Sequence, residues 1–219
     1  MKLTTLRKAL IAGLACLTCV LSLASCRVNL TSGENGLYDD KNKITYCHAS
    51  PAYEAVALVK EYGKLTVTDQ ESYVLHTIPG MDPTEMLATE DYNIVYAEGV
   101  AMPTLLEMAP TILRICVDSS ETVREIHKLD DSVAIASLVS DFTTGKSLSY
   151  PAGSPLRSYK ARFESTQYPG FYYSLTYVEY AEDVEIDGVS YGRYFLRSAF
   201  EDNFIPVGDE IHKSMGFTD

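Results

Sequence analysis

The sequence predicts an α+β domain built on an antiparallel sheet, with a few short helices on one face. Short runs of β-branched and aromatic residues alternate with turn signals along most of the chain. The clearest apolar stripe at helical spacing follows Asp130-Asp131. No repeat and no Pro- or Ser-rich linker divides the chain after residue 36. An all-β sandwich with helical insertions is the alternative.

The first half of this domain is expected to consist mainly of strands. A hairpin is predicted over 36–50, because β-forming residues flank a polar turn. Asp82-Pro83-Thr84-Glu85 combines an N-cap Asp, a Pro at N1 and a Glu at N3, which predicts the start of a short helix. Further strands are expected within 53–67, 73–78 and 92–97.

The second half is expected to contain the main helix and the longest strands. Its helix starts after Asp130-Asp131 and ends at Gly145. Pro169-Gly170 is typical of a type II turn and Asp187-Gly188 of a hairpin. Strands are expected at 111–117, 159–167, 171–180, 184–186, 191–198 and near 205, and helical turns at 102–108 and 209–215.

The N-terminal segment differs in charge from the rest of the chain. Lys2, Arg7 and Lys8 precede an apolar run over 9–23, and the first 25 residues contain no acidic residue. The run is shorter than the roughly 20 apolar residues of a membrane span. It is typical of a secretory signal, which is removed from the mature protein.

The end of this run, Leu23-Ala24-Ser25-Cys26, resembles the bacterial lipobox. The resemblance covers residues 1–26 only, and it implies cleavage after Ser25 and a diacylglyceryl group on Cys26. Two acyl chains anchor a protein stably to a bilayer. We therefore expect an exported protein, lipid-anchored to the outer face of a cell membrane, with the choice of envelope membrane open. The expected organisation is a signal peptide (1–25), a lipidated tether (26–36) and one globular domain (37–219).

Charge excludes one class of partner. The chain has a net charge of −12, and removal of the signal leaves 15 basic and 30 acidic residues, a net charge of −15. Nucleic-acid phosphates would repel such a domain. The membrane, through the lipid anchor, is the first expected partner; an envelope protein, a peptide or a glycan are the others.

Two cysteines remain once the signal is removed and Cys26 is lipidated. Cys47 and Cys116 are enough for one disulfide in a compartment that permits such bonds. The alternative is two free thiols packed as small apolar groups.

The sequence offers no catalytic or metal-binding motif. Gly-x-Ser-x-Gly is absent, and the histidines lack the spacing of metal ligands. We therefore predict no catalytic residue, no metal ligand and no cofactor.

Tyrosine is concentrated in the last third: nine of the 16 lie between residues 150 and 194. Half-exposed tyrosines suit sugars, peptides or a partner protein. Lys160 and Arg162 share one strand face and Arg193 and Arg197 another, so coinciding faces would form a cationic strip. In the alternative, tyrosine is simply a good β-former and the cations pair with nearby glutamates. The predicted binding surface comprises Tyr172, Tyr173, Tyr177, Tyr180, Tyr191, Tyr194, Arg193 and Arg197.

These observations favour a non-catalytic surface lipoprotein that acts as a binding or interaction module. The alternatives are an extracytoplasmic hydrolase that uses dispersed carboxylates, and an accessory subunit of an envelope transporter or sensor. Acid–base chemistry would require carboxylates from separate segments to converge in a cleft.

The lipid anchor gives the first testable prediction. Replacement Cys26→Ala removes the thiol to which the lipid is attached, so metabolic lipid labelling and membrane retention should both be lost. Cys47→Ala, in the mature domain, is the control and should keep both. Unchanged labelling of Cys26→Ala would refute the lipoprotein assignment.

Overall fold

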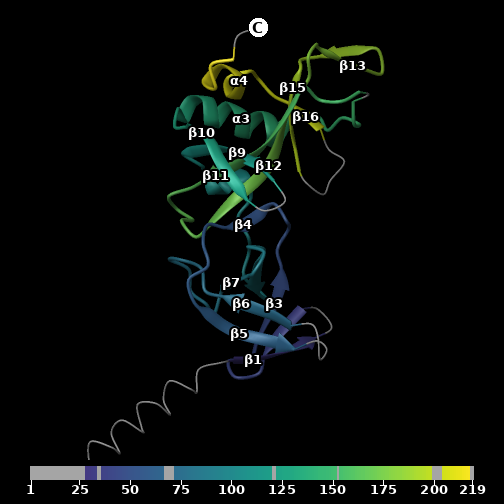
Figure 1. Ribbon diagram of the computed structural model, residues 1–219. Helices are drawn as coiled ribbons and strands as arrows, with labels where there is room; N and C mark the ends of the chain where they lie inside the picture. The colour runs from purple at the N-terminus through teal and green to yellow at the C-terminus, as the bar shows by residue number, and fades with distance from the viewer. Residues whose placement is uncertain are drawn as a thin grey trace, which may run out of the picture.

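A computed structural model describes residues 28–33, 36–66, 72–119, 122–151, 153–198 and 204–217. Figure 1 shows a barrel of strands at the N-terminal end and, beyond it, a second sheet with helices packed against it. The predicted α+β class, with antiparallel sheets and short helices, is confirmed.

The barrel closes through its first strand. β1 pairs antiparallel with β2 and parallel with β5, so every strand of the barrel has two neighbours. At Gly63 the two backbones approach closely, since a Cβ there would lie 2.6 Å from the carbonyl oxygen of Val28. The strand order is β1 (Val28–Gly33), β2 (Gly36–Asp39), β3 (Ile44–His48), β8 (Ile94–Ala97), β7 (Met86–Thr89), β6 (Ser72–His76) and β5 (Glu61–Thr66). Leu37, Tyr46, Leu75, Leu87 and Val95 are buried in the barrel core.

The second sheet is antiparallel throughout. Its order is β10 (Val123–Leu129), β9 (Ile112–Asp118), β11 (Arg157–Glu164), β12 (Phe171–Glu179), β15 (Tyr194–Arg197) and β16 (Phe204–Pro206). β13 (Val184–Ile186) and β14 (Val189–Tyr191) form a separate hairpin. Its turn residues Asp187 and Gly188 both have positive φ, as the sequence predicts for this dipeptide.

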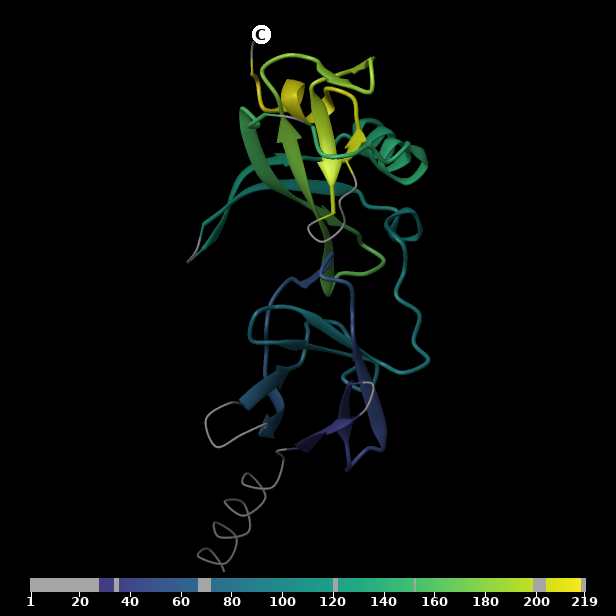
Figure 2. The same ribbon diagram turned by 90° about the vertical axis from the view of Figure 1, so that its right-hand side faces the viewer.

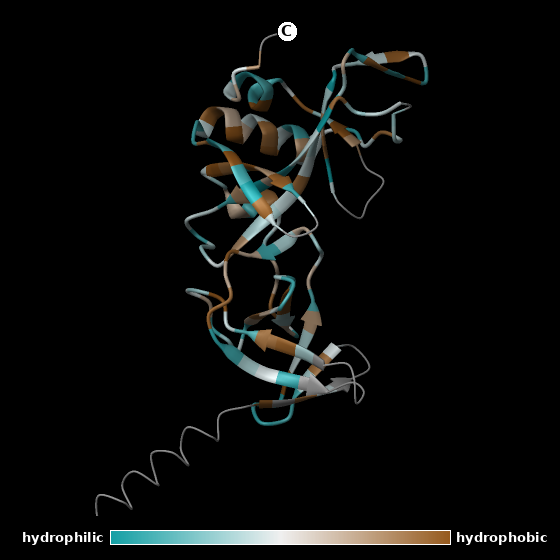
Figure 3. Ribbon diagram, in the orientation of Figure 1, coloured by the Kyte–Doolittle hydropathy of each residue, from teal (hydrophilic) through white to brown (hydrophobic). Residues whose placement is uncertain are grey.

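Helices cover one face of this sheet. α3 (Ser132–Thr144) begins at Asp131, whose carboxylate accepts hydrogen bonds from the backbone N–H groups of Val133 and Ala134. Apolar stretches of this helix are brown in Figure 3. Leu138 is buried in the same core as Phe163 and Tyr177 of the sheet. The shorter α2 (Leu105–Met108) and α4 (Glu210–Ser214) contribute Leu105 and Ile211 to this core.

A short strand connects the barrel to the sheet. β4 (Tyr53–Ala55) follows β3 in the chain and pairs with the first residues of β12, as Figure 2 shows at the junction of the two sheets. Its middle residue, Glu54, also forms a bridge with Asn93, just before β8. Tyr53, Ile78 and Phe171 are buried together beneath this junction.

Two local expectations are wrong, and one strand lies where none is predicted. The helix predicted at Asp82 is a turn, in which Asp82 accepts a hydrogen bond from the backbone N–H of Thr84, and the buried residues that follow form β7. β10 was not expected, because it lies at the sheet edge and a bulge between Glu125 and His127 interrupts its alternation. Residues 28–33 of the expected tether form β1, since Val28 and Leu30 are buried in the barrel.

The packing of α3 gives a stability prediction. Leu138 is 0% exposed and Val133 on the same helix is 77% exposed. We expect Leu138→Ala to lower the free energy of unfolding by about 3 kcal/mol, because it leaves a cavity against the sheet. Val133→Ala should change it by less than about 0.5 kcal/mol. If denaturant titrations show that Leu138→Ala and Val133→Ala lose the same free energy of unfolding, this packing is contradicted.

Candidate functional site

The face of the second sheet opposite the helices carries polar side chains; we call it the open face. Ala161, Phe163 and Leu175 point into the helical core, so their neighbours along the same strands point the other way. The open face therefore presents Lys160, Arg162, Ser174, Thr176 and Arg197, each only partly exposed or buried. The predicted coincidence of two cationic faces thus holds for Lys160, Arg162 and Arg197.

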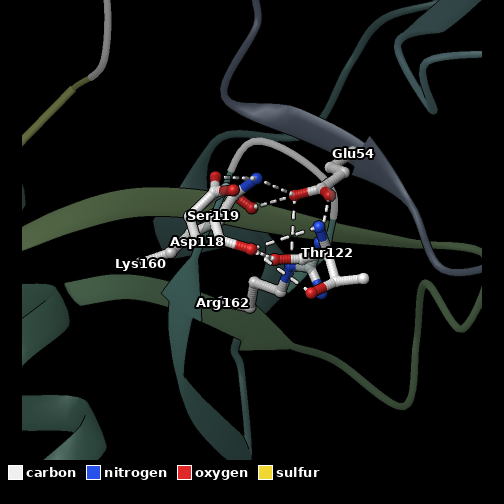
Figure 4. A network of polar contacts seen from close by, with 7 residues as sticks. Glu54, Asp118, Ser119, Thr122, Lys160 and Arg162 are labelled. Atoms are coloured by element: carbon white, nitrogen blue, oxygen red, sulfur yellow. Dashed lines mark hydrogen bonds and ion pairs between the residues drawn. The ribbon is translucent and has the colours of Figure 1, made fainter. Parts of the chain in front are cut away.

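Glu54 of β4 reaches over this face and binds two of the cations. Its carboxylate accepts hydrogen bonds from Nε and Nη2 of Arg162, and lies 2.9 Å from Nζ of Lys160. Ser174 Oγ donates a further hydrogen bond to the Glu54 carboxylate at 2.9 Å. Figure 4 shows Lys160 and Arg162 pointing toward Glu54. We call Glu54, Lys160, Arg162 and Ser174 the Glu54 cluster.

The Glu54 cluster favours the ionised carboxylate. Burial alone would raise the pKa of Glu54, but the hydrogen bonds from Arg162 and Lys160 outweigh it and hold this pKa below its ordinary value. The side chain of Glu54 is only 14% exposed, so little water competes with these contacts. Glu54 is therefore a fixed negative charge paired with two cations.

A cleft of about 660 Å³ opens beside the Glu54 cluster. Asp118 stands on its rim, 3.6 Å from Lys160 Nζ, and is half exposed. Ser119 and Thr122 bond to each other at the adjoining turn, where Ser119 Oγ donates to the Thr122 carbonyl at 2.9 Å (Figure 4). We call this the Glu54 cleft; besides Glu54, Lys160 and Arg162, its lining includes Asp91, Tyr92, Asp118, Ser119, Thr122 and Tyr172.

A second ion-pair network extends the charged surface toward the sheet edge. Arg114 of β9 lies 2.6 Å from both Glu125 of β10 and Glu164 of β11. The hydrogen bonds that Arg114 donates to Glu164 and Glu125 raise its pKa further above its ordinary value. The ion pairs of Arg114 thus link the three neighbouring strands β9, β10 and β11.

The predicted tyrosine surface is wrong for most of its members. Tyr177 and Tyr180 are 0% and 5% exposed. Tyr173 and Tyr194 pack against the helical core, and Tyr191 packs against the core around Phe195. Alternation indicates two faces but not which of them α3 covers. Tyr173, Tyr177 and Tyr194 lie on the face that α3 covers, whereas Tyr180 and Tyr191 pack in a separate core around Phe195. Tyr172 alone lines the Glu54 cleft, with the Arg162 guanidinium 5.2 Å from its ring centre.

The predicted cations have different surroundings. Arg193 lies beside Tyr194, with Nε 2.9 Å from the phenol oxygen, and takes no part in the open face. Arg197 is on the open face, in register with Thr176. The partner of Lys160 and Arg162 is Glu54, which sequence reasoning missed; the only local signal is an acidic residue flanked by Tyr53 and Ala55.

The cysteines do not form the disulfide that the sequence allows. Cys47 lies in the barrel strand β3 and Cys116 in β9 of the second sheet, and both are free thiols. Burial raises the pKa of Cys116, which favours the inert protonated form. Cys26 lies outside the described residues.

Another buried carboxylate serves to dock α4. Glu179 is 1% exposed and lies 2.6 Å from Arg157 Nη1 and 3.3 Å from His212 Nδ1. Phe217 covers this contact, with the Arg157 guanidinium 4.0 Å from its ring centre. Glu179 is therefore enclosed in the packing of the C-terminal helix.

Comparisons with known proteins add no family: no family model matches the chain, and no significant match was found among curated proteins or solved structures. Within the described ranges, no three His, Cys, Asp or Glu side chains are grouped so that they could hold a metal ion. None of the helices described here is long and apolar enough to cross a bilayer.

The Glu54 cluster predicts a pH-dependent contribution to stability. The folded pKa of Glu54 lies below the ordinary value of 4.5, so its contribution is present above pH 4.5 and is lost as the pH falls through the folded pKa. Glu54→Gln removes the charge and should lower the free energy of unfolding by about 2 kcal/mol near neutral pH.

The control is Asp130→Asn, because the side chain of Asp130 is 78% exposed. It should change stability by less than about 0.5 kcal/mol. Denaturant titrations from about pH 7 to about pH 3 should show that the difference in unfolding free energy between Glu54→Gln and the unmodified chain becomes smaller in acid. A difference that stays constant over this range would contradict an ionised Glu54.

Proposed function

We propose that this protein is a membrane-anchored extracytoplasmic lipoprotein that binds a glycan in the Glu54 cleft without catalysing a reaction. The observation that carries the proposal is the cleft itself, which is lined by fixed charges, hydroxyl groups and two tyrosine rings. Ligand sites are commonly concave and combine such convergent polar groups with aromatic side chains.

The anchor at Cys26 is part of the proposal, and the chain order suits it. β1 begins at Val28, two residues after Cys26. In Figure 1 β1 lies at the end of the barrel that faces away from the second sheet. A lipid on Cys26 would therefore hold the barrel against the membrane and leave the Glu54 cleft on the far side of the barrel.

The position of the cleft favours a glycan over an extended peptide. Peptides often bind by adding a strand to a sheet edge, where unpaired backbone groups supply the hydrogen bonds. The Glu54 cleft lies over the face of the sheet, and the strands beneath it, β9, β11 and β12, are paired on both sides. A ligand there meets side-chain carboxylates, hydroxyls and rings, which match the hydroxyl groups and apolar faces of sugars.

The electrostatics favour binding over hydrolysis. A glycosidase needs a carboxylic acid whose pKa is raised, so that it can protonate the leaving group. Glu54 has the opposite character, because Arg162 and Lys160 lower its pKa and occupy its oxygens. Asp118, the other carboxylate beside Lys160, is half exposed on the rim. The pair therefore suits a ligand-orienting role.

Binding to a glycan array tests the proposal. We expect the full-length chain in detergent micelles to bind a subset of glycans, and Asp118→Asn to weaken that binding about tenfold through loss of a charged acceptor. Asp118 is exposed, so its replacement should leave the midpoint of thermal unfolding nearly unchanged.

Asp130→Asn is the matched control, because Asp130 also lies near a lysine but outside the cleft, and it should bind like the unmodified chain. Failure to bind any glycan, or equal binding by Asp118→Asn, would contradict the proposed function.

A further inference from the structure

A second cleft adjoins the Glu54 cleft on the open face and contains an arginine with a different environment. This cleft has a volume of about 580 Å³ and shares Lys160 and Asp118 with the first. We call it the Arg197 cleft. Its lining includes Asn93, Ser158, Ser174, Thr176 and Arg197.

Arg197 belongs to the same row of side chains as Lys160. Lys160 is in register with Thr176 of β12, and Thr176 is in register with Arg197 of β15. Residues opposite one another on neighbouring antiparallel strands point to the same face, and two strand spacings amount to about 10 Å. Arg197 therefore lies on the open face, about 10 Å across the sheet from Lys160.

No described carboxylate forms an ion pair with Arg197, whereas Arg114, Arg157 and Arg162 each bind at least one glutamate. Its Nε is buried and has no hydrogen-bond partner within the part of the chain that the structure describes. The guanidinium instead lies 6.0 Å from the ring centre of Tyr150 and 5.7 Å from that of Phe204. Aromatic faces orient a cation without neutralising it.

The Arg197 guanidinium forms no ion pair with a described carboxylate, and a ligand carboxylate in the cleft would supply that partner. Guanidinium groups bind planar carboxylates through two parallel hydrogen bonds. Ser158, Ser174 and Thr176 add hydroxyl groups beside Arg197. Lys160, the other cation of this cleft, is paired with Glu54, and the chain has a net charge of −12, so the cleft favours one carboxylate over a polyanion, which the rest of the surface would repel.

We infer that Arg197 binds the carboxylate of a uronic acid, so that the two clefts together accept an acidic oligosaccharide. This inference rests on the proposed glycan binding and specifies its ligand class. The hydroxyl groups of the uronic acid would face the serine and threonine side chains, and neighbouring sugar units would extend across Lys160 and Asp118 toward the Glu54 cleft.

Matched disaccharides test the carboxylate requirement. Cellobiouronic acid, its methyl ester and cellobiose share one carbon skeleton, and only the first carries a charge at C6. In titration calorimetry with the full-length chain, we expect the acid to bind at least about tenfold more tightly than the other two.

Arg197→Gln should abolish this preference, and Arg197→Lys should retain part of it. Arg124→Gln makes the same charge change at an exposed residue that lines neither cleft, and should keep the full preference. The ratio of acid to neutral affinity is measured within each variant, so a loss of folded protein does not imitate the effect.

Two results would overturn the inference: cellobiouronic acid that binds no better than cellobiose or not at all, or an Arg197→Gln variant that keeps the preference. If the array shows binding that depends on Asp118 while Arg197 has no effect, the inference fails and the proposed function stands. If no glycan binds in either experiment, both fail.

Discussion

The arrangement of the open face depends on one buried carboxylate. Glu54 is carried by the three-residue strand β4, yet its side chain holds Arg162 and Lys160 of β11 and receives a hydrogen bond from Ser174 of β12. β4 alone would contribute three register pairs to the junction between barrel and sheet. The ion pairs add charge-assisted contacts that are shielded from water. They also place a fixed negative charge between two cations that would otherwise repel each other.

Side chains alternate between the two faces of each strand, and this alternation places some residues in the core and their neighbours in the candidate site. On β11 and β12, residues such as Phe163 and Tyr177 pack under α3, and the residues between them line the clefts. The helices cover one face only; on the other face the core around Phe195 covers part of the sheet, and charged side chains occupy the rest. β4, which pairs with the first residues of β12, bounds the Glu54 cleft on one side, and Ser119 and Thr122 bound it on another. Most of the groups that are proposed to bind the ligand thus come from paired strands, which suits a preorganised site.

The sequence predicts local turns and helix caps, but it does not predict which distant strands and side chains pair. The hairpin at Asp187-Gly188 and the helix capped by Asp131 were predicted correctly, because turn and cap signals act within a few residues. The parallel closure of the barrel was not foreseen, because no short-range pattern specifies which strands meet. Glu54 was missed for the same reason: its partners Arg162 and Ser174 lie 108 and 120 residues away. Most of the tyrosines lie in strands, but tertiary packing decides which of them are buried, as Tyr46, Tyr53, Tyr177 and Tyr180 are.

A double-mutant cycle between Glu54 and Arg162 tests the central structural claim most directly. Free energies of unfolding would be measured for the full-length chain, for Glu54→Gln, for Arg162→Gln and for the variant that carries both. If this pair organises the open face, the sum of the two single losses of unfolding free energy should exceed the loss in the double variant. The difference, the coupling energy, should be about 1–3 kcal/mol. Losses that add to within about 0.3 kcal/mol would show that Glu54 and Arg162 act independently, and would contradict the account.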